Sequence, residues 1–357
     1  MPFCNRAPVD GNRETALKTR SNIKDIARLA GVHPSTVSRV LNPGTRSMVS
    51  EALAEEILRI ADEVGYRRNT LASGLRTRKT FTVGIMIPDL TNPVFPPIVR
   101  SAEGTLEDAG YIAILADSGS RERSEGEIIE NLRARDIDGL ILATATRRDP
   151  VVDACVEQGI PVVLVNRTVS RHHVPAVVND DELGIELALQ HLVALGHEHI
   201  AYIGGPQTTS TGYGRYHALL KSAKKLGLDL DDALVINATA FSETAGAAAL
   251  DKLLEFGKHF TAVLTANDLL ALGCYDALDA RGLQCPQDIS ITGFNDMPYV
   301  GRMDPPLTTL RIAHDALGVQ AAQLLLERIE NPDTPAEERR LAPELIVRGS
   351  TAPPTAP

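Results

Sequence analysis

Two patterns of hydrophobic and polar positions follow one another along the chain, and they predict two kinds of domain. From Ser21 to Tyr66, apolar residues recur with the period of short helices, and no segment has the pattern of a strand. From Phe81 onwards, short runs of β-branched residues alternate with helical stretches. This alternation is typical of βαβ units, which build parallel sheets with right-handed crossovers.

The second region is long enough for two sheets. About 270 residues with the alternating pattern are too many for one sheet, so we expect two α/β lobes. Helices are predicted over Pro97–Ala109, Gly184–Leu195 and Leu269–Arg281. Buried strands are predicted over Phe81–Pro88, Ile112–Ala116, Gly139–Ala143, Pro161–Val165, Ala176–Val178, Ile200–Gly204, Ala262–Thr265 and Ile289–Gly293.

The charge of the chain is unevenly distributed. The total of −10 argues against nucleic acid, yet ten basic and six acidic residues between Ser21 and Thr80 give +4, which leaves −14 for the remainder. A small basic module on an acidic body is typical of a protein that contacts phosphates with one end only. The aromatic content is 4% and Trp is absent, which argues against an aromatic-rich carbohydrate platform.

The cysteines and the N-terminus indicate the compartment. Cys4, Cys155, Cys274 and Cys285 form no CxxC pair and have no histidine at metal spacing. We expect reduced thiols, no metal and no cofactor. The first 20 residues lack the apolar core of a signal peptide, and no later run approaches membrane-spanning length. These features predict a cytoplasmic protein without membrane association.

The most informative stretch is residues 22–42, NIKDIARLAGVHPSTVSRVLN. Asn22 and Asp25 are suited to cap a first helix, and Gly31 supplies the left-handed residue that ends it. Pro34 suits the first position of a second helix, because its missing N–H needs no partner there. The pattern therefore predicts two short helices joined by a glycine turn.

The second of these helices has one apolar and one polar face. Val37, Val40 and Leu41 would be buried, which leaves short hydroxyl side chains and Arg39 outside. Hydroxyls bond phosphates, and arginine can bond guanine with two hydrogen bonds. Two helices joined by a glycine turn also occur in proteins that never bind DNA, but the local positive charge favours a DNA-binding helix-turn-helix.

This segment closely resembles the DNA-binding domain of the lactose-repressor (LacI/GalR-type) transcription regulators, whose signature contains IKDVARLAGVS and TVSRVLN. The resemblance covers nearly everything after the first 20 residues. Its further landmarks are Val64-Gly65-Tyr66, Asn69, Ala72, Leu75, Arg78, Thr80, Asn92-Pro93 with Phe95, Asp138-Gly139, Gly205-Pro206, Asn267-Asp268, Gly293-Phe294, Pro305 to Thr309, and Leu345 to Thr351.

The resemblance implies a small all-α helix-turn-helix domain and a two-lobed, periplasmic-binding-protein-like sensor with parallel sheets. It implies a repressor-type regulator, not an enzyme, that binds double-stranded operator DNA and a small-molecule effector. The expected domains are a disordered arm (1–20), the helix-turn-helix domain (21–67), a hinge (68–80), the effector-binding and dimerisation domain (81–350) and a tail (351–357).

Individual DNA-contacting positions also follow from the resemblance. Pro34 and Ser35 stand at the two positions that choose bases, and Arg39 is the expected guanine reader. Leu75 matches a residue that wedges between base pairs in the minor groove, in a hinge, Asn69–Leu75, that becomes helical on DNA. The full set of expected DNA contacts is Pro34, Ser35, Thr36, Ser38, Arg39, Asn42 and Leu75.

The chain departs from the family pattern in its DNA-binding region. His33 replaces the usual Ser cap, Arg68 replaces a common Pro, and the residues after Ser50 lack the usual Thr-Arg pair. The loop Pro43–Met48 is longer than is typical. These departures affect the expected phosphate contacts and the operator preference rather than the fold.

The expected effector site lies where parallel strands end, because the carboxyl ends of such strands meet at a cleft. Phe95 and Phe241 can enclose a ring-shaped ligand, and the polar groups around them suit a polyol or a nucleoside. Each polar residue alone fits a turn or a helix cap equally well. The expected effector contacts, partly from strand ends and partly from the resemblance, are Asp89, Phe95, Asn166, Arg167, Thr209, Thr211, Arg215, Phe241, Asn267 and Asn295.

Two of these positions depart from the family. Asn295 stands where the family usually has Asp, and Asn166 where it often does. An amide donates as well as accepts, whereas an ionised carboxylate only accepts. The ligand is therefore expected to present an acceptor or a negative charge there.

Two other classes of protein are weighed against a regulator. A dehydrogenase or hydrolase is disfavoured because no GxGxxG, GxSxG or Walker motif is present. The histidines His172-His173 and His197-Glu198-His199 are expected to be solvated loop residues rather than metal ligands. A solute-binding protein would share the two lobes, but it would carry a signal peptide and no helix-turn-helix.

The expected assembly is a homodimer on a pseudo-palindromic operator, with one helix-turn-helix in each major groove. No heptad pattern follows Arg348, which favours a dimer over a tetramer. A ligand that closes or twists the lobes would change the separation of the two hinges. Inducer and corepressor both fit such a pocket.

Overall fold

The computed structural model describes residues 22–41, 43–66, 79–119, 124–171 and 174–355. The chain forms two compact units, Met1–Arg78 and Lys79–Pro357. The arm expected at residues 1–20 and the hinge segment Asn69–Leu75 lie outside the described residues. Each unit is described here by itself.

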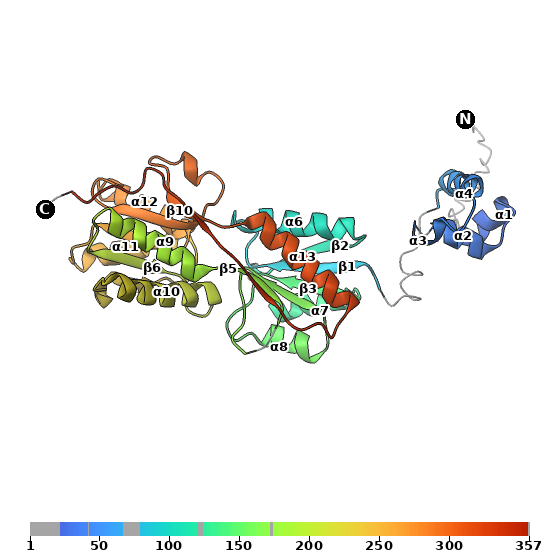
Figure 1. Cartoon of the computed structure of the whole chain (residues 1–357), viewed down its shortest axis with the longest axis horizontal. Coiled ribbons are helices and arrows are strands. Elements are labelled where there is room, and N and C mark those ends of the chain that lie inside the picture. Colours follow the sequence, from blue (N-terminus) through green and yellow to red (C-terminus); the bar gives the residue numbers. More distant parts are fainter. Residues whose placement is uncertain (1–21, 42, 67–78, 120–123, 172–173, 356–357) are drawn as a thin grey trace, which may run out of the picture. The chain divides into compact units, whose positions relative to one another are not determined.

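The first unit is a small helical domain whose core comes from apolar residues at helical spacing (Figure 1). Ile26, Val37, Val40 and Ile57 are fully buried where three of its helices meet. Burial of these side chains, rather than helix propensity, is what stabilises helices this short. The helices are α1 (Ile23–Leu29), α2 (Pro34–Leu41), α3 (Pro43–Arg46) and α4 (Glu51–Glu63).

The turn between α1 and α2 forms as the sequence predicts. The Asn22 carboxamide oxygen accepts the backbone N–H groups of Lys24 and Asp25, and the Asp25 carboxylate accepts the N–H of Asn22 at 2.9 Å. Gly31 has a φ of +63°, the left-handed conformation that glycine adopts at little cost. Pro34 opens α2. The predicted caps and turn are confirmed.

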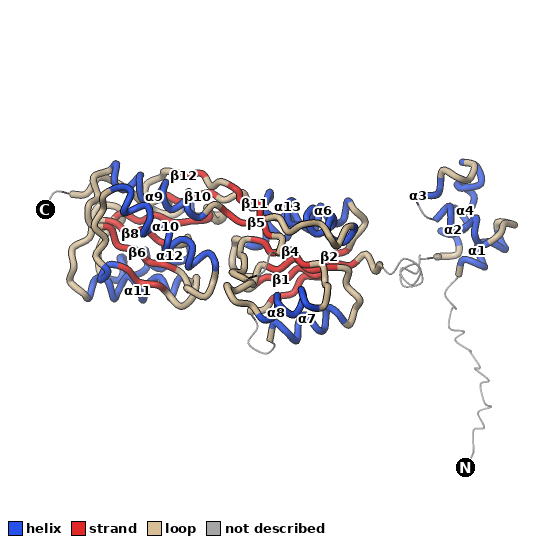
Figure 2. The backbone as a smooth tube through the Cα atoms, turned by 60° about the horizontal axis from the view of Figure 1, so that its bottom comes forward, coloured by secondary structure: helices blue, strands red, loops and turns tan. Residues whose placement is uncertain are grey.

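The second unit consists of two α/β lobes, each built on a six-stranded sheet (Figures 1 and 2). The strand orders are β11-β5-β4-β3-β1-β2 in the first lobe and β12-β10-β9-β8-β6-β7 in the second. Every pairing is parallel except that of β12 with β10. The strands are β1 (Thr82–Ile87), β2 (Ile112–Asp117), β3 (Gly139–Leu142), β4 (Val162–Val165), β5 (Ala176–Asn179), β6 (Ile200–Gly204), β7 (Val235–Asn237), β8 (Ala262–Thr265), β9 (Ser290–Asn295), β10 (Thr308–Arg311), β11 (Glu338–Leu341) and β12 (Glu344–Ile346).

Helices cover both faces of each sheet, as right-handed crossovers require (Figure 1). In the first lobe α6 packs on α13, while α7 and α8 border a separate hydrophobic core. In the second lobe α9 pairs with α10, and α11 pairs with α12. The helices are α6 (Phe95–Asp108), α7 (Glu125–Arg133), α8 (Pro150–Glu157), α9 (Asp181–Ala194), α10 (Ser210–Leu226), α11 (Glu243–Glu255), α12 (Asp268–Ala280) and α13 (His314–Glu330).

The chain passes between the lobes after β5, after β10 and after β11 (Figure 1). Three segments of the chain therefore join the two lobes. The predicted fold, a helix-turn-helix domain and a two-lobed sensor with parallel sheets, is confirmed.

Glycine allows the backbones of α11 and α12 to approach closely. A Cβ atom at Gly273 would lie 1.9 Å from the carbonyl oxygen of Glu243, and one at Gly246 would lie 2.2 Å from that of Leu270. Real Cβ atoms do not come this near to a backbone oxygen, so only glycine fits at either position. This contact holds α12 in place, and the first residues of α12 lie beside the pocket described below.

The predicted burial of one strand is wrong. Residues 112–116 were expected to be buried, but β2 is the edge strand of the first sheet, and Ile112 and Leu115 are 69% and 42% exposed. The apolar run is the same whether a neighbouring strand covers it or not, so the pattern alone does not distinguish an edge from a centre. The prediction therefore missed an exposed apolar edge.

Residues Thr351 and Ala352 contact the second lobe. Thr351 Oγ1 lies 2.9 Å from His191 Nε2, and the backbone N–H of Ala352 donates to Ser290 Oγ at 3.1 Å. The second lobe thus extends beyond residue 350. Within the described part of the chain, no helix combines the length and the apolarity needed to cross a membrane.

Candidate functional site

Helix α2 turns one face to the core and the other to solvent. Val37 and Val40 are buried, whereas Ser35 and Arg39 are exposed. Arg39 forms no ion pair with any described residue, so its guanidinium is available to a partner. The other predicted contacts on this helix, Pro34, Thr36 and Ser38, are half-buried. The predicted contacts Asn42 and Leu75 lie outside the described residues.

His33 takes the place of a hydroxyl cap at the start of α2. Its Nδ1 accepts the backbone N–H of Ser35 at 3.2 Å and lies 2.8 Å from the hydroxyl of the same residue. A side-chain acceptor on this N–H satisfies one of the unpaired donors at a helix start. The imidazole therefore fixes both the first turn of α2 and the rotamer of Ser35.

Replacing His33 with alanine should destabilise the helical domain by about 1 kcal/mol, because an N–H of α2 loses its acceptor. His33→Ser should retain most of that stability, since a serine hydroxyl accepts the same N–H. Thermal unfolding of the full chain, followed by circular dichroism, measures both changes. Equal loss in the two variants would show that the imidazole acts by packing rather than as a cap.

In the two-lobed unit, a pocket lies between the lobes at the ends of the parallel strands. It encloses about 30 Å³. Its lining contains no carboxylate among the described residues and consists of Asn92, Val94, Phe95, Asn166, Arg167, Thr211, Arg215, Phe241, Asn267 and Asn295. Eight of the ten predicted effector residues thus share one pocket.

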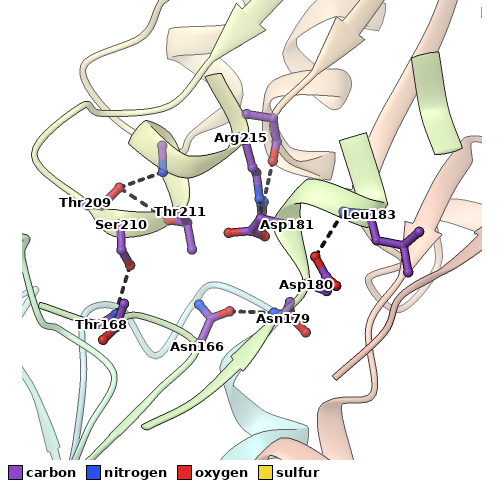
Figure 3. A network of polar contacts seen from close by, with 12 residues as sticks. Asn166, Thr168, Asn179, Asp180, Asp181, Leu183, Thr209, Ser210, Thr211 and Arg215 are labelled. Carbon is purple, nitrogen blue, oxygen red and sulfur yellow. Dashed lines mark hydrogen bonds and ion pairs between the residues drawn. The ribbon is translucent and has the colours of Figure 1, made fainter. Parts of the chain in front are cut away.

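Strand ends with unusual backbone conformations place two asparagines in this pocket. Asn166 follows β4 with a φ of +63°, and Asn295 ends β9 with a φ of +119°. Non-glycine residues rarely adopt positive φ, and such strain is common where a side chain is aimed at a ligand. The Asn179 amide donates to the Asn166 carboxamide oxygen at 3.1 Å, which fixes the orientation of Asn166 (Figure 3).

Arg215 is held by a buried ion pair. Its Nε donates to the Asp181 carboxylate at 2.8 Å, and a second nitrogen donates to the Ala266 carbonyl (Figure 3). Its guanidinium carbon lies 3.7 Å from the ring centroid of Phe294. Burial raises the pKa of Asp181, an effect that Arg215 opposes. Removal of either side chain would leave the other as a buried charge without a partner.

Arg167 has fewer partners than Arg215. One terminal nitrogen donates to the Thr144 carbonyl at 3.2 Å, while the buried Nε has no hydrogen-bond partner. Burial, opposed by the charge of Glu125 and aided by that of Arg215, lowers the pKa of Arg167 to about 10. The guanidinium still carries its proton at neutral pH.

Aromatic rings border the pocket from both lobes. Phe95 is the first residue of α6 and is buried, and Phe241 stands before α11. The Phe241 ring packs directly on Gly205, where a Cβ atom would lie 2.1 Å from the ring. Asn92 and Phe241 also line a second depression of about 390 Å³, so the two spaces are neighbours.

Two predicted effector residues lie outside the pocket lining. Thr209 caps α10, where its hydroxyl accepts the N–H of Gly212 at 3.1 Å and donates to the Pro206 carbonyl at 2.8 Å. Asp89 is exposed, lines the larger depression and accepts the N–H of Thr91 at 2.8 Å. Both perform the turn and cap roles that such residues commonly have.

Both units match known family models. Residues 22–69 match the model described as bacterial regulatory proteins, lacI family, and residues 189–351 match the periplasmic binding protein-like domain. The transcriptional regulator MalR of Streptomyces coelicolor is 34% identical over 93% of this chain and 97% of its own length. The chain belongs to the LacI family.

Solved structures of LacI-family proteins share the fold. The cellobiose complex of the regulator CelR has a TM-score of 0.71 and 31% identity, over 93% of this chain and 100% of that one. The lac repressor dimer bound to operator and an anti-inducer has a TM-score of 0.80 and 25% identity, over 94% of this chain and 100% of that one. This LacI-family chain is a DNA-binding transcriptional regulator that responds to a small molecule, and it is not an enzyme.

The sequence-based list missed two pocket residues. Asn92 and Val94 line the pocket beside Phe95. Their signal was available, because the Asn92-Pro93 pair follows the first strand and belongs to the LacI-type pattern. A residue directly after a strand and before a helix is placed at the cleft by topology alone.

One histidine prediction is wrong. His197 was expected to be solvated, but it is 2% exposed, and its ring nitrogens lie 2.7 Å from Thr261 Oγ1 and 3.0 Å from the Ala352 carbonyl oxygen. It joins the end of the chain to the second sheet. His172 and His173 lie outside the described residues. No group of three or more metal-ligating side chains occurs among the residues that the structure describes.

Proposed function

We propose that this regulator is a repressor that binds its operator through α2. A sugar-like metabolite bound between the lobes would raise or lower its affinity for the operator. The observation that carries the proposal is the pocket itself, in which amides, guanidinium groups, a hydroxyl and two aromatic rings converge from both lobes. Sugar pockets need this combination of hydrogen-bonding groups and ring faces. A cellobiose complex among the related structures supports the same class of ligand.

On the DNA side, the exposed Arg39 is proposed to bond a guanine in the major groove, with Ser35 beside it. Pro34, Thr36, Ser38 and Asn42 would complete the base and backbone contacts, and Leu75 would enter the minor groove.

Within the pocket, the paired aromatic rings would enclose the ring of the effector. The amides of Asn166, Asn267 and Asn295 would bond its hydroxyls. The enclosed 30 Å³ is smaller than the space that small-molecule ligands occupy, roughly 300 Å³ or more. We therefore expect the lobes to part before a ligand enters, and this movement would couple ligand binding to the DNA-binding domain.

A second copy of the chain is the proposed partner of the exposed apolar edge of the sensor. Leu115 shares a face of β2 with Asp117, whose carboxylate accepts the N–H of the exposed Leu90 at 3.1 Å. The turn after Leu90 lines the same depression as the exposed Tyr299. Exposed apolar side chains such as Leu115 and Leu90 are candidates for burial at an interface. One related structure is of a lac repressor dimer bound to operator, and a dimer of this chain would act in the cytoplasm on a pseudo-palindromic operator.

Replacing Leu115 with glutamate should weaken dimerisation by about tenfold or more, because a charge would be buried at the interface. Val156→Glu is a matched control, since Val156 is 41% exposed on α8 of the same lobe. Sedimentation velocity over a concentration series measures the dimerisation constant of each variant. A dimer unaffected by Leu115→Glu would place the interface elsewhere.

The effector role is tested on an operator duplex selected from random DNA. Fluorescence anisotropy of the labelled duplex with full-length protein is followed as sugars, sugar acids, sugar phosphates and nucleosides are added. The proposal predicts that at least one compound changes operator affinity, and that the change is lost in Phe241→Ala. A compound that bound the protein tightly without any effect on the operator would contradict it.

A further inference from the structure

The net charge of the effector pocket is positive. Two arginines line it, and no aspartate or glutamate among the described residues does. A neutral polyol can accept hydrogen bonds from a guanidinium but does not neutralise it, and burying a charge away from water is costly unless an opposite charge compensates it.

Arg215 is already compensated by the chain. The Asp181 carboxylate bonds its Nε, the Ala266 carbonyl takes another N–H, and the Phe294 ring covers one face. The Arg215–Asp181 pair is therefore close to neutral. It leaves little attraction for an external anion.

Arg167 has no ion-pair partner among the described residues, although the charge of Glu125 acts on it. Its single hydrogen bond within that part of the chain goes to the Thr144 carbonyl, and its buried Nε has no partner there. Burial is the main cause that lowers the pKa of Arg167, and the charge of Glu125 opposes it more strongly than that of Arg215 adds to it. A buried polar atom without a partner inside a binding pocket indicates the position of a ligand group.

Glu125, which acts electrostatically on Arg167, and Asp149, which acts on Glu125, have other hydrogen-bond partners. The Asp149 carboxylate caps α8 by accepting the N–H groups of Val151 and Val152, and it also accepts the N–H of Thr146 at 2.9 Å. Glu125 accepts from the Ser118 hydroxyl at 3.3 Å, and burial together with Asp149 raises its pKa. Neither carboxylate contacts the guanidinium.

The starts of three helices add to the positive potential. Phe95 is the first residue of α6, Thr211 lies in the first turn of α10, and Asn267 caps α12. The N-terminal end of a helix carries partial positive charge and favours anions. Only α12 has an acidic residue in its first turn, Asp268, whose carboxylate bonds Thr309 and the N–H of Met297 instead.

We infer that the effector is an anion, a small sugar-like polyol whose carboxylate or phosphate group bonds the guanidinium of Arg167. This inference rests on the proposed function and narrows its ligand to one charge class. Arg167 selects that class, while the asparagines and phenylalanines hold the polyol part. Asn166 and Asn295 carry amides rather than carboxylates, which avoids repulsion of the anion.

The test compares charged and neutral members of matched pairs on full-length protein by isothermal titration calorimetry. The probes are glucose against gluconate and glucose 6-phosphate, galactose against galacturonate, and ribose against ribose 5-phosphate. At least one charged member should bind on the order of tenfold more tightly than its neutral partner, as a charge-assisted hydrogen bond provides. Gluconate and galacturonate report on a carboxylate, and the phosphates report on a phosphoryl group.

Two variants assign the preference to Arg167. Arg167→Gln should bring the charged and neutral members to similar affinity. Asn166→Asp retains an acceptor for the Asn179 amide but adds a negative charge next to Arg167. It should therefore also weaken binding of the charged members. Arg133→Gln, which removes a half-buried arginine paired with Glu130 on α7, should leave the preference unchanged.

The inference is overturned if the neutral members bind as tightly as the charged ones, if no charged member binds, or if Arg167→Gln keeps the preference. Neutral sugars that bind and change operator affinity would overturn the charge inference and leave the proposed function intact. Charged compounds that bind through Arg167 without changing operator affinity would support the charge inference and contradict the proposed function.

Discussion

Replacing Arg215 with methionine should destabilise the two-lobed sensor by about 3–5 kcal/mol, the cost of leaving one partner of a buried ion pair alone. Arg215 is 2% exposed, and its removal would leave the Asp181 carboxylate without its positive partner. The Ala266 carbonyl and the Phe294 ring would lose their contacts as well. Methionine fills much of the same volume, so the loss reports on charge rather than on a cavity.

The destabilisation of Arg215→Met should depend on pH. Burial already raises the pKa of Asp181 above its ordinary value, and loss of Arg215 should raise it further. A carboxyl with a raised pKa in the folded state stabilises the fold when protonated, and that contribution is lost as the pH rises through its pKa. The free energy of unfolding of the variant should therefore be closest to that of the unaltered protein in acidic buffer. The difference between the two should increase as the pH rises.

Urea unfolding of the full chain between pH 5 and 8 measures both effects. Arg281→Met is a matched control, because Arg281 pairs with Asp251 on the surface, where an ion pair contributes about 1 kcal/mol or less. The double variant Arg215→Met with Asp181→Asn should recover part of the stability. If Arg215→Met cost no more than Arg281→Met, the pair would not be the buried pair described above.

Replacing Arg39 with alanine should remove about 1–3 kcal/mol of discrimination at one base of each half-site. The side chain is exposed on α2 and has no ion-pair partner among the described residues. The loss should appear as similar affinity for the selected operator and for a duplex with that single base pair changed, since among the bases guanine presents the two acceptors, O6 and N7, that a guanidinium bonds together in the major groove.

Arg59→Ala is the control for the charge lost with Arg39. Arg59 lies on α4 and pairs with Glu56 and Glu63, so its removal changes the net charge equally but touches no predicted base contact. Anisotropy titrations on both duplexes at fixed salt compare the variants. Unchanged base preference in Arg39→Ala would mean that α2 is not the reading helix.

The fold was largely predictable because apolar residues recur along the sequence with one pattern in helices and with another in strands. Central strands such as β3 and β4 are uninterrupted apolar runs, and both lie where the sequence predicts them to within a residue. β11 was missed because its sequence, ERRL, is charged, as an exposed edge strand allows. The edge position of β2 was missed for the opposite reason, since its apolar residues look like those of a central strand.

The site was predictable as far as topology determines it. Asn166, Asn267 and Asn295 were expected at the cleft because each follows or ends a strand, and all three line the pocket. The difference between Arg167 and Arg215 was not predictable, because it depends on which carboxylates the fold brings near each guanidinium. Asp181 precedes Arg215 by a whole helix and strand, so no local pattern links the two.

The most direct test of the central claim is selection of bound duplexes from a randomised DNA library, with full-length protein at moderate salt. A dimeric helix-turn-helix regulator should enrich a pseudo-palindrome whose half-sites are separated by about one helical turn, and Arg39→Ala should lose one fixed base in each half. Enrichment of no motif by folded, dimeric protein, with or without a metabolite extract, would contradict the account.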